Sequence, residues 1–338
     1  MTVRIGINGF GRIGRNYLRA ARLAGADVEV VAVNDLTSAE TLAHLLKYDS
    51  THGRFGADVS VEGSNLVLDS GPVTVLAERE PKALPWSDLG VDVVIEATGL
   101  FTSKETAGAH IDAGAKRVII SAPGTGVDAT FVVGVNDDTF DPAKDVVVSN
   151  ASCTTNCLVP MVKVLDDAFG VESGLMTTVH AFTNDQNLLD LPHKDLRRAR
   201  AASINIVPAS SGAARATSLV LESMKGRLDG AALRVPVADG SITDFTAVIP
   251  GAVTAEQVNA AFAAAASTGP LSKVLVYTED PIVSTDIVGS PASCTFDSLL
   301  TMVMPSASGI TLVKVNGWYD NEWGYANRLV DLSLVVGA

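Results

Sequence analysis

Residues 3–14 read V-R-I-G-I-N-G-F-G-R-I-G, in which a short apolar strand runs directly into the pattern G-x-G-x-x-G. Helix-forming residues follow from 15 to 24, and a second apolar run, V-E-V-V-A-V-N, then ends beside Asp35. This order of strand, glycine turn, helix, strand and acid is typical of a dinucleotide-binding unit. The alternative is a glycine-rich turn between strand and helix that binds nothing.

Each glycine of the pattern has a distinct expected role. Gly9 permits the tight turn, Gly11 lets a pyrophosphate approach the backbone, and Gly14 lets the helix pack on the strand. The free N–H groups at the helix N-terminus suit phosphate. Asp35 would accept hydrogen bonds from the adenosine ribose and repel a 2′-phosphate, so we expect NAD rather than NADP.

Three later apolar runs also end in small or polar residues. V-D-V-V-I-E-A ends at Thr98, K-R-V-I-I-S-A ends at Pro123, and D-V-V-V-S-N ends near residue 150. Ligands bind at the carboxyl ends of strands in open parallel sheets. We therefore predict that residues 1–150 form a doubly wound α/β domain of the Rossmann type.

Within residues 151–317, the apolar runs after residue 170 alternate more and are joined by shorter turns. They predict an α+β domain with a mostly antiparallel or mixed sheet. Thr254 and Gln257 form an expected capping box at the start of an alanine-rich helix. Residues 318–338 are a further helical candidate, whose domain membership the pattern alone leaves open.

Composition narrows the class of protein. The chain has 338 residues and a net charge of −13, which argues against broad nucleic-acid binding. The sequence has no apolar run long enough to span a bilayer and no signal-peptide pattern. We expect a cytoplasmic protein without membrane contact. Its three cysteines are an odd number, which argues against a disulfide framework.

Two of those cysteines occur in S-N-A-S-C-T-T-N-C-L-V-P, residues 149–160. Cys153 is expected where a strand ends and a helix begins, a position that lowers a thiol pKa and favours a nucleophile. Cys157 lies one helical turn further and reads as a small buried residue. Metal ligation is not expected, because the histidines show no paired metal spacing. Pro160 should kink this helix or start a new one.

Three other segments are candidates for chemistry. His180, at the end of the expected strand M-T-T-V-H, is either the base for the thiol or a hydrogen-bonded core residue. The basic cluster Arg197, Arg198 and Arg200 is either a solvated surface or a site for an anionic substrate. The turn S-S-G-A-A, residues 210–214, suits a second anion.

Taken together, the motifs resemble those of phosphorylating glyceraldehyde-3-phosphate dehydrogenases. The resemblance spans nearly the whole chain in family order, and S-N-A-S-C-T-T-N-C-L is its most specific segment. The other segments are I-N-G-F-G-R-I-G-R, V-N-D-L-T, L-A-H-L-L-K-Y-D-S-T-H-G-R-F, T-V-H-A-F-T-N-D-Q, D-L-P-H-K-D-L-R-R-A-R and W-Y-D-N-E-W-G-Y.

The resemblance implies an activity. Cys153 would attack the aldehyde carbon of D-glyceraldehyde 3-phosphate, and His180 would act as general base. Hydride would pass to NAD and leave a thioester, which inorganic phosphate would cleave to give 1,3-bisphosphoglycerate. An erythrose-4-phosphate dehydrogenase shares this scaffold and is the second reading within the enzyme class.

The resemblance also implies which residues bind each ligand. The substrate phosphate site maps onto Thr183, Arg200 and Arg234. The inorganic phosphate site maps onto Ser152, Thr154, Ser211 and Gly212. The cofactor contacts map onto Gly9, Arg12, Ile13, Asp35, Arg79, Thr98, Ser121 and Asn321.

The family likeness extends to assembly and to cofactor choice. Residues from about 180 to 205 resemble the family's S-loop, which lines a neighbouring cofactor site in a homotetramer. The C-terminal helix, residues 318–338, would return to the cofactor domain. Leu36, Leu191 and Pro192 resemble the NAD-selective form. The chain departs from common family patterns at Ala209, Ser210 and Arg215, and Gly317 and Ala97 stand where serine is common.

Overall fold

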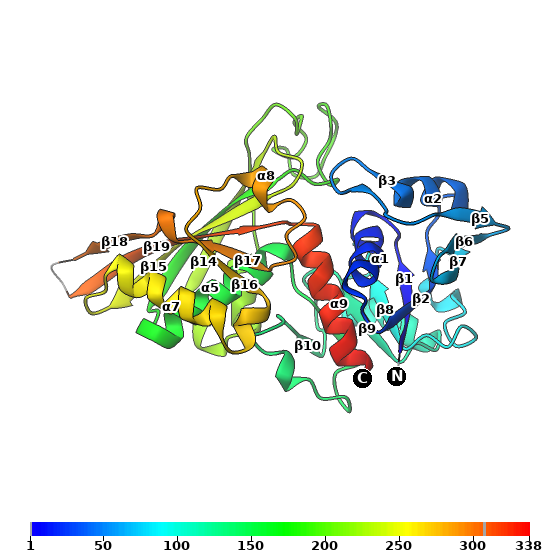
Figure 1. The fold of residues 1–338 in the computed structure, drawn as a ribbon, viewed down its shortest axis with the longest axis horizontal. Helices are drawn as coiled ribbons and strands as arrows, with labels where there is room; N and C mark the ends of the chain where they lie inside the picture. The colour runs from blue at the N-terminus through cyan, green and yellow to red at the C-terminus, as the bar shows by residue number, and fades with distance from the viewer. Residues whose placement is uncertain (1, 307–308) are drawn as a thin grey trace. The chain divides into compact units, whose positions relative to one another are not determined.

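The computed structural model describes residues 2–306 and 309–338, which form two compact units. The first unit comprises Met1–Ser152 and Ala326–Ala338, and the second comprises Cys153–Tyr325. The structure therefore assigns residues 318–325 to the second unit, whereas the sequence grouped them with the C-terminal helix. Both units mix helices with one large sheet (Figure 1).

The strands of the first unit are short. They are β1 (Val3–Asn8), β2 (Val28–Asn34), β3 (Tyr48–Asp49), β4 (Gly53–Arg54), β5 (Ser60–Glu62), β6 (Asn65–Leu68), β7 (Gly71–Leu76), β8 (Val93–Glu96), β9 (Arg117–Ile120), β10 (Ala129–Thr130) and β11 (Val147–Ser149).

Among the described residues, nine of these strands form one sheet in the order β10-β11-β9-β8-β1-β2-β7-β6-β5. Pairing is parallel from β10 to β7, and antiparallel where β6 and β5 extend the edge. The chain runs outward from β1 through β2 and β7, and then returns to β8 on the other side of β1. This reversal beside β1 is the switch point at which doubly wound sheets bind ligands. The predicted α/β class is confirmed.

Helices cover this sheet. They are α1 (Arg12–Ala24), α2 (Ala39–Lys47), α3 (Lys104–Ala107), α4 (Ala109–Asp112) and most of α9 (Trp323–Gly337), with short 3-10 turns at Pro81–Ala83 and Asp137–Thr139.

The C-terminal helix is fixed inside the first unit. The Tyr17 hydroxyl on α1 lies 2.8 Å from Ser333 Oγ on α9, and both side chains are buried. Gly337 lies so close to Val3 that an added Cβ would sit 2.4 Å from Val3 Cγ1. Figure 1 shows α9 (red) running alongside α1 (blue).

The second unit contains a mixed sheet. Its strands are β12 (Ser173–Ala181), β13 (Val207–Ser210), β14 (Leu228–Val235), β15 (Ser241–Pro250), β16 (Leu275–Thr278), β17 (Cys294–Asp297), β18 (Met302–Pro305) and β19 (Ile310–Tyr319). The main order is β13-β14-β12-β15-β19-β17-β16, and β18 pairs with β19. Pairing is parallel in β12–β14 and β16–β17 and otherwise antiparallel, as predicted.

The helices of this unit are α5 (Cys153–Phe169), α6 (Ala213–Ala216), α7 (Ala255–Ser267) and α8 (Ser284–Ile287), with 3-10 turns at Thr217–Leu219, Glu222–Met224, Pro270–Lys273 and Ser298–Leu300. Helix α5 packs against β15, β17 and β19, and α7 packs against α5 and β16.

Two helix predictions can be compared directly with the structure. The capping box of α7 is present, because Thr254 Oγ1 accepts from Gln257 N at 3.3 Å and Gln257 Oε1 accepts from Thr254 N at 2.9 Å. Helix α5, in contrast, continues through Pro160 as one 17-residue element. The expected new helix at Pro160 does not form. Pro160 is buried, and packing of the apolar residues around it outweighs the hydrogen bond that proline cannot donate.

Within residues 2–306 and 309–338, no helix is both long enough and apolar enough to cross a membrane.

Candidate active site

The glycine turn between β1 and α1 has the geometry that a dinucleotide needs. Gly9 adopts a φ of +92°, and an added Cβ would lie 2.7 Å from Thr98 N. At Gly14 an added Cβ would lie 2.3 Å from the Gly9 carbonyl oxygen, so only glycine lets α1 begin this close to the strand. Gly11 has open space where its Cβ would be. The turn is therefore tightly packed where it faces the rest of the protein, at Gly9 and Gly14, and open at Gly11.

A cavity of about 350 Å³ lies beside this turn, at the carboxyl ends of β1, β2 and β8. Its lining residues are Asn8, Gly9, Gly11, Asn34, Asp35, Leu36, Glu78, Arg79, Ala97, Thr98, Leu100 and Phe101.

Asp35 is held at the mouth of the turn. One carboxylate oxygen accepts from Phe10 N at 3.0 Å and the other from Thr37 N at 3.0 Å. Each oxygen keeps acceptor capacity for a further donor, such as a sugar hydroxyl. The Arg79 side chain also lines the cavity and makes no hydrogen bond or ion pair with the residues described.

The other residues predicted to bind the cofactor lie outside this lining. Arg12 is ion-paired with Asp49 at the start of α1, where Ile13 follows it. Ser121 follows β9, and its N–H donates to the Glu96 carbonyl at 2.9 Å. Asn321 belongs to the second unit, where its Oδ1 accepts from Ser241 Oγ at 2.7 Å.

In the second unit, Cys153 and His180 come together from separate elements. Cys153 is the first residue of α5, and His180 is the second-last residue of β12. Their Sγ and Nε2 atoms are 3.4 Å apart. Of the sequence alternatives for Cys153 and His180, the geometry favours a thiol with its base.

The neighbours of His180 identify the nitrogen that faces the thiol. Arg234 Nη1 lies 2.9 Å from His180 Nδ1, and it lies 3.0 Å from both the Ala181 carbonyl oxygen and Thr183 Oγ1. We assign its two hydrogens to these two oxygens, which can accept them. His180 Nδ1 is 2.7 Å from the same carbonyl, so we assign a hydrogen to Nδ1. Nε2 is then an acceptor that points at the sulfur.

Burial sets the resting protonation of this pair. Burial raises the pKa of the Cys153 thiol to about 11, against the lowering expected from its position at a helix start, and the Arg234 cation opposes that rise. Burial lowers the pKa of His180 to about 3, and Arg234 lowers it further. The partial positive charge at the start of α5 also favours a thiolate. In the free chain at neutral pH, the stable pair is therefore a thiol beside a neutral imidazole, which is able to accept the thiol proton.

Beside this pair lies a cluster of charged and hydroxyl groups that suits a phosphate. Arg234 contacts Thr183, and Thr183 in turn donates to Asp185, which is ion-paired with Arg198. The buried Nε of Arg234 has no partner among the residues described.

The structure places Arg198, not the predicted Arg200, in this cluster. The Arg198 side chain is 20% exposed, whereas that of Arg200 is 63% exposed and its Nε lies 2.9 Å from Asp190. The segment around them is a loop without regular periodicity, so the sequence could not indicate which arginine points inward.

The buried Tyr319 hydroxyl links Thr154, at the start of α5, to Thr178 on β12. Thr154 Oγ1 lies 2.9 Å from the Tyr319 hydroxyl, which also lies 2.8 Å from Thr178 Oγ1. The ring of Tyr319 packs edge-on against His180, with centroids 5.9 Å apart. Sequence reasoning missed Tyr319 as a contributor, and its only signal was its place in W-Y-D-N-E.

The remaining residues expected at the inorganic phosphate site lie in turns. Ser211 Oγ accepts from Ala213 N at 3.3 Å, and Gly212 precedes α6, which packs against α5. Ser152 ends the first unit, directly before Cys153.

Comparison with known proteins identifies the family to which the chain belongs. Residues 3–104 match the model described as glyceraldehyde 3-phosphate dehydrogenase, NAD binding domain, and residues 152–321 match that of the C-terminal domain. A glyceraldehyde-3-phosphate dehydrogenase of Streptomyces coelicolor is 60% identical over 337 residues, covering 100% of this chain and 99% of the relative. Glyceraldehyde-3-phosphate dehydrogenase 1 of Streptomyces avermitilis is 61% identical with the same coverage. The one from Geobacillus stearothermophilus is 56% identical over 338 residues, again covering 100% and 99%.

The chain belongs to the glyceraldehyde-3-phosphate dehydrogenase family. Its first unit contains the family's NAD-binding domain, and the residues present there fit that cofactor. A Cβ at Gly9 or Gly14 would clash with the backbone of the turn, Gly11 has open space beside it, and Asp35 and Arg79 both line the cavity.

Cys157 is the second cysteine of the family's cysteine segment, and its setting is unlike that of Cys153. It is fully buried, its thiol contacts that of Cys294, and its Sγ lies 3.5 Å from the Gly317 carbonyl oxygen. It therefore occupies the core position that the sequence predicted.

Proposed function

We propose that this chain catalyses the NAD-dependent oxidative phosphorylation of D-glyceraldehyde 3-phosphate to 1,3-bisphosphoglycerate. The observation that carries the proposal is the 3.4 Å approach of Cys153 Sγ to His180 Nε2, in a chain of this family. The thiol attacks the aldehyde carbon while its proton passes to Nε2 and from there to the former carbonyl oxygen, so a hemithioacetal forms on Cys153 and Nε2 is free again.

In the second step, the oxidation of the hemithioacetal, His180 Nε2 again acts as the base. Nε2 takes the hydroxyl proton of the hemithioacetal as the carbon loses hydride, and a thioester on Cys153 results. NAD, when bound, supplies the hydride acceptor. The contact between His180 Nδ1 and the Ala181 carbonyl keeps the ring oriented through both proton transfers.

Inorganic phosphate then attacks the thioester carbon, and the Cys153 sulfur leaves. We infer that Thr154, Ser211 and Gly212 bind this attacking phosphate with Ser152. The packing of α5 against α6 supports this, because it brings the start of α5, with Thr154, and the turn before α6 into the same region. The substrate phosphate is proposed to bind Thr183 and Arg234, with Arg198 taking the role that the sequence gave to Arg200.

For the cofactor we propose selectivity for NAD over NADP, supported by the position of Asp35 and Leu36 in the cavity lining. Gly9, Arg12, Ile13, Arg79, Thr98, Ser121 and Asn321 remain proposed cofactor contacts.

We further propose a homotetramer that works in the cytoplasm. Exposed apolar side chains support assembly, since large exposed patches usually mark interfaces. They occur on the sheet at Leu175 and in the loop segment proposed as the S-loop, at Leu188, Leu189, Leu191, Leu196, Ile204 and Ile206. Light scattering on the purified protein tests this, and a monomeric mass would contradict it.

The activity itself is tested by NADH formation. Glyceraldehyde 3-phosphate should give NADH in a reaction that depends on inorganic phosphate, and erythrose 4-phosphate should be a poorer substrate. Phosphate-independent NADH formation, or preference for erythrose 4-phosphate, would contradict the proposal.

A further inference from the structure

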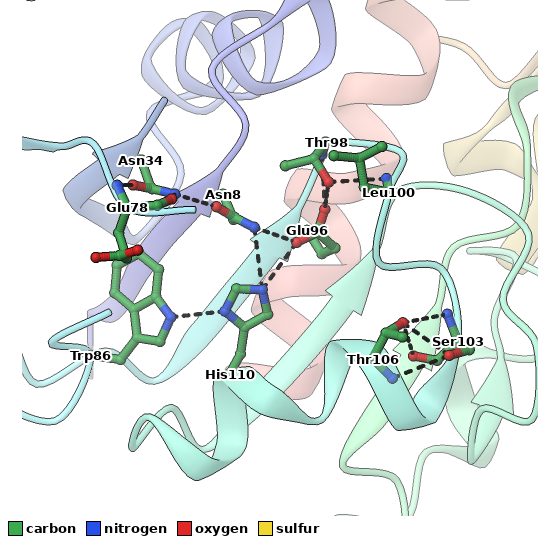
Figure 2. A network of polar contacts seen from close by, with 10 residues as sticks. All are labelled: Asn8, Asn34, Glu78, Trp86, Glu96, Thr98, Leu100, Ser103, Thr106 and His110. Carbon is green, nitrogen blue, oxygen red and sulfur yellow. Dashed lines mark hydrogen bonds and ion pairs between the residues drawn. The ribbon is translucent and has the colours of Figure 1, made fainter. Parts of the chain in front are cut away.

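A network of polar groups, built around the buried side chains of Glu96 and His110, lies directly behind the cofactor cavity, and we call it the strand-end network (Figure 2). Its members are Asn8, Asn34, Glu78, Trp86, Glu96, Thr98 and His110. The Glu96 side chain is 1% exposed and His110 is fully buried. Nothing in the proposed reaction uses either group.

The first arm of the network starts at a backbone group and has only one possible direction. Asn34 Oδ1 accepts from Glu78 N at 2.8 Å, and Asn34 Nδ2 donates to the Glu78 carbonyl at 2.8 Å. This fixes the orientation of the Asn34 amide, whose Nδ2 also donates to Asn8 Oδ1 at 2.7 Å. Asn8 Nδ2 therefore donates to Glu96 Oε2, at 2.6 Å.

The second arm starts at an indole, which can only donate. Trp86 Nε1 donates to His110 Nδ1 at 2.9 Å, so the hydrogen of the neutral ring is on Nε2. Nε2 then donates to Glu96 Oε2 at 3.0 Å. Space for the indole depends on Gly6, because a Cβ there would lie 2.8 Å from Trp86 Cζ3.

The third arm leads into the cavity wall. Glu96 Oε1 accepts from Thr98 N at 2.9 Å and contacts Thr98 Oγ1. Leu100 N donates to that hydroxyl at 3.1 Å, which leaves the hydroxyl hydrogen directed at Glu96. Four donors thus converge on one buried carboxylate, and His110, being neutral, does not balance its charge. A buried carboxylate is tolerated only when its donors are all in place.

Two of the three arms end on residues that line the cofactor cavity. Asn8 is the last residue of β1, Asn34 is the last residue of β2, and Thr98 comes just after β8, so Glu96 ties together three neighbouring strand ends. Glu78 and Leu100 join through their backbone N–H groups. A core that needed only stability would be served as well by apolar side chains of similar shape. Here the Asn8–Asn34 arm and the Thr98 arm end on the wall of the cavity, and the Trp86–His110 arm anchors Glu96 to the core.

We propose that Glu96 is a positioning residue for NAD, which holds the cavity wall at residues 78 and 98–100 in the binding conformation and is itself locked by the Trp86–His110 pair. This rests on the proposed function, since it presumes that the cavity binds NAD. Glu96 touches neither substrate nor reacting atoms, and acts through Thr98 and Asn8.

Glu96→Gln is the sharpest test, because it keeps the shape and removes one acceptor oxygen. The glutamine NH₂ must face either Thr98 or the Asn8–His110 pair, all of which donate. We expect the dissociation constant for NAD, measured by titration calorimetry, to rise about tenfold, the usual effect of one unmatched buried donor. The KM for NAD should rise with it, while kcat and the KM for aldehyde and phosphate stay near wild type.

Trp86→Phe is the second variant, and it frees His110 to place its hydrogen on Nδ1. Tyr17→Phe is the matched control, because it removes a buried hydrogen bond of 2.8 Å in the same unit, away from the cavity lining. Amide hydrogen exchange without cofactor should speed up at residues 78–80 and 98–100 in both network variants and not in Tyr17→Phe.

The outcomes separate the two proposals. If wild-type protein fails to bind NAD, the proposed function fails and this inference with it. If wild type binds NAD and the folded network variants bind it within about twofold of wild type, Glu96 is not a positioning residue. An equal loss of NAD affinity in Tyr17→Phe would mean general loosening of the unit and would also overturn the inference.

Discussion

Arg198 and Arg200 differ by two positions in the chain, and the structure predicts that removing Arg198 lowers activity much more than removing Arg200. The Arg200–Asp190 pair has side chains 63% and 60% exposed, and such pairs contribute at most about 1 kcal/mol. Arg200→Ala should therefore lower kcat/KM for glyceraldehyde 3-phosphate by less than about fivefold.

Arg198→Ala should have a much larger effect. It removes the cation that pairs with Asp185, whose carboxylate also contacts Thr183, and Asp185 then competes with substrate phosphate for Arg234. A lost hydrogen bond to a charged group costs about 1.5–3 kcal/mol, which corresponds to a decrease of about 10- to 150-fold in kcat/KM. Most of the change should be in the KM for the aldehyde.

Initial rates of NADH formation, with NAD and phosphate saturating, measure both variants over a range of glyceraldehyde 3-phosphate. The dissociation constant for NAD is the internal control and should stay unchanged in both. A loss in Arg200→Ala equal to or greater than that in Arg198→Ala would refute the geometric reasoning and restore the assignment from sequence.

Three further predictions concern the thiol and the glycine turn. Cys153→Ser should abolish oxidation while NAD still binds, whereas Cys157→Ser should keep most activity; equal losses in steady-state assays would mean that the thiols act as a unit. Gly14→Ala should abolish measurable NAD binding by calorimetry, because its Cβ would lie 2.3 Å from the Gly9 carbonyl oxygen, and unchanged affinity would contradict the tight turn. Arg234→Leu should raise the pKa of the Cys153 thiol, because the cation that favours the thiolate is gone. The pH profile of iodoacetamide alkylation should then move to higher pH, and a shift to lower pH would contradict this.

The sequence predicted those features that depend on local pattern. The strand-turn-helix at Gly9–Gly14 and the capping box of α7 follow from short-range chemistry, and both are present. The pairing of Cys153 with His180 was inferred from the expected position of Cys153 at a helix start, that of His180 at a strand end, and the family resemblance. The structure adds the distance between them.

Other features depend on packing and were not predictable. Pro160 continues a helix because its buried neighbours stabilise the helix, which pattern alone does not reveal. The strand-end network joins residues as far apart as Asn8 and His110 in the chain, and no sequence motif links them. The second unit ends at Tyr325 because of tertiary contacts. The amino-acid composition does not change across residues 318–325, so the sequence carries no signal for this boundary.

The glycine at 317 has a consequence for how this protein tolerates change over evolution. A Cβ at that position would lie 2.5 Å from Cys294 Sγ and 2.7 Å from Met161 Sδ, so the sulfur atoms occupy the volume that a side chain at 317 would need. A substitution at 317 alone is therefore strongly disfavoured, and it becomes acceptable only when Cys294 has been exchanged for a smaller residue and the Met161 side chain has also moved or been replaced. Positions 161, 294 and 317 are thus epistatic, and the order in which they mutate decides which sequences of this family remain reachable.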